Sequence, residues 1–148
     1  MKLLFFDSYL STIRNSVGTK SYQTLWAETE TGKKDIIENG RLACALFVSG
    51  VLKEFNLIKE RHATVSGTLK DMQNSGWYPI KEPKEGCVIH WDAEDNSPEN
   101  TEHLGFFVGG GKAISNDRKA KTPQEHNWDY RRVLGAYWNS KLENKYFN

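Results

Sequence analysis

Two side chains of this sequence have the chemistry of a nucleophile and its base, Cys44 and His103. A cysteine attacks a carbonyl carbon as its thiolate, and a helix N-terminus or a nearby imidazolium lowers the thiol pKa from about 8.5 to roughly 3.5–7.5. Cys44 lies about one turn after Asn39-Gly40, which breaks the chain ahead of an apolar helix. The unpaired N–H groups of that helix would face the sulfur, and the Cys44 backbone N–H would help to stabilise an oxyanion.

The alternative for Cys44 is an inert core position. Free cysteines are among the most buried residue types, and this one is flanked by Ala43 and Ala45. On the helix alone the inert interpretation is favoured, and His103 changes that balance.

His103 stands immediately before Leu-Gly-Phe-Phe-Val, at the mouth of an expected hairpin. A general base has to be held rigidly within hydrogen-bond reach of the nucleophile, and a strand edge provides that support. Gly105 has no side chain, so we expect it to let the Cys44 helix approach the strand closely.

A third polar group is needed to fix the orientation of the imidazole. The returning strand offers Ser115, Asn116 and Asp117. Asn116 is favoured because an amide accepts from an imidazole N–H better than a hydroxyl does. Ser115 and Asp117 remain alternatives, because a bulge in the hairpin would change which side chain faces His103.

The elements that would position these residues follow from hydrophobic periodicity and turn residues. Helices are expected over about residues 1–17, 42–55 and 63–74, with a loop at 31–34. Strands are expected over about 87–91, 104–108, 113–115 and 132–138, with an acidic loop at 92–102. Helices followed by an antiparallel meander indicate an α+β fold.

Four short segments occur in an informative order and separation. They are Arg41-Leu-Ala-Cys44-Ala-Leu-Phe-Val-Ser, Ser75-Gly-Trp77, Gly86-Cys-Val-Ile, and His103-Leu-Gly-Phe-Phe-Val-Gly-Gly-Gly-Lys-Ala-Ile-Ser. Over residues 41–116 the chain resembles the NlpC-type papain-like cysteine peptidases and the related CHAP amidases. The resemblance implies a central Cys-bearing helix packed on an antiparallel sheet, with Cys44 as nucleophile and His103 as base. It also implies hydrolysis of an amide bond, often in bacterial cell-wall (peptidoglycan) peptides.

The sequence departs from the family pattern at three places. Ala43 and Ala45 flank the cysteine where acidic or small polar residues are usual. Cys87 replaces a usual Asp, and Ser115 or Asn116 stands where a His is usual. The residues that flank Cys44 are expected to line the cleft, so the departures bear mainly on the substrate.

Other histidines and aromatic residues are candidates for the same site. His90 and the rings of Trp77 and Trp91 are expected at the cleft or in support of it, whereas His126 is expected to be a solvated or satisfied loop residue. The Cys87-Val-Ile-His90 spacing does not predict zinc, because strand positions three apart point to opposite faces. Cys87 is expected in the core, and no metal or cofactor is expected.

Composition limits the remaining function classes. The 148 residues fit one domain, with a leading helix over 1–17 and a core over 41–138, and a net charge of +1 gives no nucleic-acid footprint. The short apolar N-terminus is expected to be neither a signal peptide nor a membrane span, which favours the cytoplasm and no membrane partner. The sequence therefore predicts a thiol hydrolase acting on a peptide or amide substrate. The alternative is a non-catalytic peptide- or ligand-binding module on the same fold.

Overall fold

A computed structural model describes residues 1–94 and 101–148. Residues 95–100 of the expected acidic loop, which include Asp95 and Glu99, lie outside this described part. The helices of the described part are α1 (Phe5–Asn15), α2 (Cys44–Glu54), α3 (Val65–Asn74) and a short 3-10 helix η1 (Ser140–Glu143). None of these helices is long and apolar enough to cross a membrane.

Six strands form one antiparallel sheet in the order β3-β8-β4-β5-β6-β7. Their bounds are β3 (Tyr78–Ile80), β4 (Val88–Trp91), β5 (His103–Gly109), β6 (Lys112–Asp117), β7 (Thr122–Asn127) and β8 (Val133–Trp138). The α+β class with antiparallel strands is confirmed. The short outer strand β3 and strand β7 were not predicted, because their Pro residues and polar composition hide the strand pattern.

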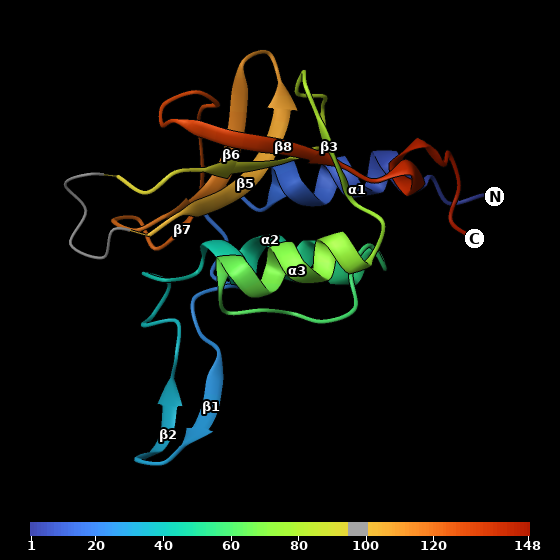
Figure 1. Cartoon of the computed structure of the whole chain (residues 1–148). Helices are drawn as coiled ribbons and strands as arrows, with labels where there is room; N and C mark the ends of the chain where they lie inside the picture. Colours follow the sequence, from blue (N-terminus) through green and yellow to red (C-terminus); the bar gives the residue numbers. More distant parts are fainter. Residues whose placement is uncertain (95–100) are drawn as a thin grey trace.

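A separate two-stranded hairpin, β1 (Trp26–Thr29) and β2 (Gly32–Asp35), projects away from the sheet and helices (Figure 1). The sequence predicts only a loop at 31–34. Neither strand has a buried side chain, so there is no alternation of buried and exposed apolar residues to detect.

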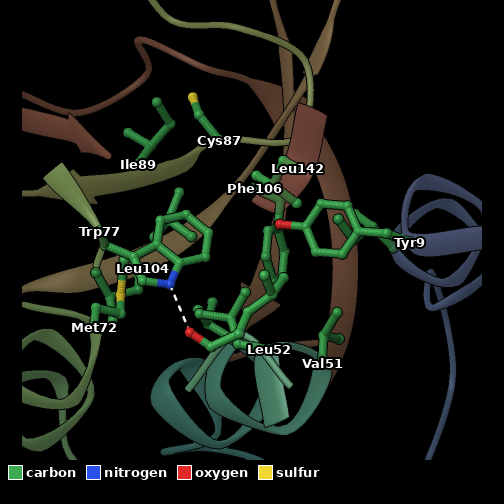
Figure 2. Close-up of a cluster of buried hydrophobic side chains, with 14 of the residues drawn as sticks. Tyr9, Val51, Leu52, Met72, Trp77, Cys87, Ile89, Leu104, Phe106 and Leu142 are labelled. Carbon is green, nitrogen blue, oxygen red and sulfur yellow. Dashed lines mark hydrogen bonds between the residues drawn. The ribbon is translucent and has the colours of Figure 1, made fainter. Parts of the chain in front are cut away.

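The core lies between the helices and one face of the sheet. Phe106 of β5 makes edge-to-face contacts with Phe47 of α2 and Tyr9 of α1. Cys87 is fully buried in this core, as predicted. Figure 2 shows Trp77 in the same cluster, with its indole N–H donating to the Leu57 carbonyl at 2.8 Å. Trp77 was expected at the cleft, and this is wrong, because its ring is buried against the helices instead.

Candidate active site

The loop before α2 is held in place by one carboxylate. Asp35 accepts hydrogen bonds from the backbone N–H groups of Leu25 at 2.9 Å, Ile37 at 3.0 Å and Asn39 at 2.7 Å. Gly40 follows with φ +93°, and a Cβ there would lie 2.5 Å from the Lys121 carbonyl oxygen. The loop therefore needs glycine at this position to pass the β6–β7 turn and begin the helix.

Cys44 is the first residue of α2, and it is partly exposed. The preceding Ala43 provides no capping side chain, so the first N–H groups of the helix are not capped by it. Burial raises the pKa of the Cys44 thiol, although the Leu104 and Ala45 backbone and the charge of Arg131 act in the opposite direction. Cys44 is therefore a thiol rather than a thiolate at neutral pH.

His103 is the first residue of β5, and it is buried beneath the ring of Trp91, with ring centroids 5.5 Å apart. Its Nε2 lies 2.9 Å from the Ser115 hydroxyl. Burial, together with the positive charge of Arg131, lowers the pKa of His103 to about 3. The imidazole is therefore neutral at physiological pH, with one ring nitrogen unprotonated.

Asn116, the favoured orienting residue, does not hold His103. It lies two residues from Ile114, which pairs with Phe106, so its side chain is on the helix-facing side of the sheet. Its amide donates to the Gly40 carbonyl at 2.8 Å and so ties β6 to the loop before α2.

The contact with His103 belongs to Ser115, one of the two alternatives. Asp117, the other alternative, uses its carboxylate to accept the N–H groups of Lys119 and Ala120, both at 2.8 Å. Its side chain therefore stabilises the β6–β7 turn.

Gly105 makes room for different neighbours from those expected. A Cβ on Gly105 would lie 2.7 Å from the Ser115 Cβ and 2.9 Å from the Trp91 ring. The absent side chain thus lets Trp91 and Ser115 reach the His103 side of the sheet, rather than admitting the Cys44 helix.

His126 is part of the site, although the sequence favoured a loop residue. It lies on β7, and its Nε2 is 2.6 Å from the Ser115 hydroxyl. Its ring packs on Tyr130, with centroids 4.3 Å apart. The missed signal was β7 itself, because a strand beside β6 places His126 on the same face as Ser115.

A cavity of about 830 Å³ brings these groups to one place. Its walls include Cys44, His103, Ser115, Asn116, His126, Tyr130 and Arg131. The volume lies within the usual range for small-ligand and substrate sites. The Cys44 thiol and the His103 ring share this cavity, but no hydrogen bond joins them in the described residues.

His90 does not line the cavity, and its Nε2 lies 2.6 Å from a carboxylate oxygen of Glu102, which does. Arg131 pairs with Glu94 at 3.2 Å beside the cavity. Within residues 1–94 and 101–148, no group of three or more His, Cys, Asp or Glu side chains is placed to hold a metal ion.

Comparisons with protein-family models and with curated proteins find no match to this chain. Chemically, the site brings together a thiol, a neutral imidazole and a hydroxyl that contacts this imidazole. That set can perform nucleophilic attack with proton transfer.

Proposed function

We propose that the protein is a cysteine hydrolase that cleaves an amide bond, with Cys44 as nucleophile, His103 as base and Ser115 as the residue that orients the base. The observation that carries the proposal is the meeting of these three side chains at one cavity. The Ser115 hydroxyl lies 2.9 Å from His103 Nε2, and no hydrogen bond to His103 Nδ1 is found within the described residues. Nδ1 is then the nitrogen that serves the thiol.

The reaction follows from these groups. His103 Nδ1 takes the thiol proton as Cys44 sulfur attacks the carbonyl carbon, and the oxyanion is stabilised by the Cys44 backbone N–H at the start of α2. The imidazolium returns the proton to the leaving amine, which leaves a thioester. Water, losing its proton to Nδ1, attacks the thioester and releases the acid product, and the imidazolium returns that proton to the departing sulfur to restore the thiol. The missing thiol–imidazole hydrogen bond can form when substrate binds, because such bonds are often long in ligand-free sites.

The papain-like arrangement and the cell-wall-type peptide substrate also belong to this proposal. They rest on the motif order of the sequence together with two observations. α2 packs on β5 and β6, and Cys44 begins that helix. The polar position after Ala-Ile in the hairpin motif is Ser115, the residue in contact with His103.

Hydrolysis of amide-linked peptides tests the proposal. Soluble fragments of bacterial cell-wall peptide, and a mixture of unrelated peptides, would be incubated with the protein and the products identified by mass spectrometry. We expect cleavage by wild type, loss of detectable cleavage in Cys44→Ala, and a loss of roughly 10²–10⁴-fold in His103→Gln. Cys87→Ser is the matched control, because Cys87 is the other free cysteine and lies in the core. Cleavage that survives in Cys44→Ala would refute the assignment.

A binding module without catalysis is the second candidate. It is favoured by the burial that raises the pKa of Cys44 and lowers that of His103, because both shifts oppose a thiolate–imidazolium pair. Saturable peptide binding that is equal in wild type and Cys44→Ala, with no cleavage in either, would favour this function.

A further inference from the structure

The polar contacts of the site do not end at Ser115. The Ser115 hydroxyl lies between two imidazoles, 2.9 Å from His103 Nε2 and 2.6 Å from His126 Nε2. His126 Nδ1 in turn lies 2.8 Å from the Asn127 carbonyl oxygen. These contacts form a single chain from a backbone carbonyl to the proposed base.

The direction of every hydrogen bond in this chain follows from its fixed end. A carbonyl oxygen only accepts, so His126 Nδ1 must carry the proton that is donated to Asn127. In the neutral ring Nε2 is then unprotonated and accepts from the Ser115 hydroxyl. A hydroxyl has one proton, so Ser115 Oγ accepts from His103 Nε2–H. His103 Nδ1 is left with its lone pair.

We propose that His126 is a positioning residue that fixes His103 in its Nε2–H tautomer through Ser115 and so keeps Nδ1 available as the base for Cys44. This inference rests on the proposed function, because Nδ1 matters only if Cys44 is the nucleophile. Without His126 the Ser115 hydroxyl loses the imidazole that accepts its proton, and it can donate to His103 Nε2 instead. That reversal would place the proton on Nδ1 and remove the base.

Other groups around His126 are compatible with the neutral ring. Burial, which is the largest cause, lowers the pKa of His126, and Arg131 acts in the same direction. The Asn127 carbonyl and the carboxylates of Asp117 and Glu125 raise the pKa but do not outweigh burial. The Tyr130 hydroxyl also faces Ser115, and burial raises the pKa of Tyr130, so this phenol stays protonated and can donate to the second lone pair of Oγ.

Nitrogen NMR of the histidine rings measures the tautomer of each imidazole, because long-range proton–nitrogen correlations distinguish the two neutral tautomers. In the intact protein at neutral pH we expect the Nδ1–H form for His126 and the Nε2–H form for His103. In His126→Ala we expect His103 to shift from one tautomer to a mixture. His62→Gln is the control. His62 contacts Asp71 and takes no part in the hydrogen bonds that link His126 to His103, so this substitution should leave the His103 tautomer unchanged. An Nδ1–H form of His103 in wild type, or an unchanged tautomer in His126→Ala, would overturn the inference.

A second measurement serves if His126→Ala does not fold. Protonation of His126 turns Nε2 into a donor, which reverses the Ser115 hydrogen bond. Acidification of wild type should therefore alter the His103 tautomer when His126 titrates, before His103 itself takes a proton. A His103 tautomer that does not change as His126 takes its proton would contradict the inference. Neither NMR measurement requires a substrate. An absence of hydrolytic activity would therefore refute the proposed function, whereas only an unexpected His103 tautomer would refute the role of His126.

Discussion

At the residue scale, the site holds the proposed nucleophile, Cys44, and the proposed base, His103, in the uncharged state. Burial raises the pKa of Cys44 and lowers that of His103 to about 3. In the proposed reaction the proton therefore leaves the sulfur during the attack rather than beforehand. A preformed ion pair, as in cysteine enzymes with a strongly lowered thiol pKa, is not expected here.

The pH dependence of Cys44 alkylation tests this resting state. Because the thiolate is the reactive form and its pKa is raised, the rate with iodoacetamide should rise about tenfold per pH unit between about pH 6 and pH 8. The rate is measured by peptide mass spectrometry, with the buried Cys87 as an internal reference. A plateau of reactivity below pH 7 would instead reveal a stabilised thiolate.

At the element scale, the position of Cys44 depends on the turn that precedes α2. Gly40 combines a left-handed backbone with close approach to the Lys121 carbonyl oxygen, and Asn116 donates to the Gly40 carbonyl from β6. The start of the helix is thus tied to β6 and packed closely against the β6–β7 turn. A change in this turn should move the nucleophile as well as lower stability.

Substitution of Gly40 by Ala tests that dependence against a matched glycine. Gly18 also has a positive φ, +77°, but a Cβ there meets nothing within 4 Å. Gly18→Ala should lower the free energy of unfolding by about 1–2 kcal/mol through the backbone alone. Gly40→Ala should lose about 1–3 kcal/mol more through the clash, as measured by denaturant unfolding. Equal losses in the two variants would contradict the close approach.

The order of elements could be predicted because the apolar patterns of α1, α2, β5 and β8 are strong. The hairpin of β1 and β2 could not, because its exposed strands lack an apolar pattern. Cys44 and His103 were proposed from residue type, spacing and the family resemblance, and both line one cavity. Ser115 was identified only as an alternative, because the choice depends on strand register, and His126 was missed because β7 was missed. Contacts across a sheet are set by register, which a single sequence specifies weakly.

At the scale of the whole molecule, the buried imidazole couples stability to pH. His103 takes a proton at its ordinary pKa of 6.5 in the unfolded chain but only near 3 in the folded protein. The contribution of the neutral His103 to the free energy of unfolding is therefore fully present above about pH 6.5 and is lost as pH falls toward 3. The free energy of unfolding should fall by up to about 1.4 kcal/mol per pH unit in that range.

Denaturant unfolding of wild type and His103→Gln between about pH 7 and pH 4.5 measures this coupling. The wild-type slope should exceed that of His103→Gln, because glutamine takes no proton. Asp71 contributes to the pH dependence of stability in a lower pH range, because its pKa is about 2. Burial alone would raise this pKa, but hydrogen bonds from His62, from the Lys59 and Glu60 backbone and from Ser75 outweigh burial. Parallel slopes for the two proteins would show that His103 is not held neutral by the fold.

The central claim is that His103 activates Cys44, and acetyl transfer from p-nitrophenyl acetate tests it without knowledge of the natural substrate. We predict a thioester on Cys44, located by mass spectrometry, with formation slowed by at least about 100-fold in His103→Gln and unchanged in Cys87→Ser. Acetylation that occurs elsewhere in the chain, or that proceeds on Cys44 equally fast without His103, would contradict the claim.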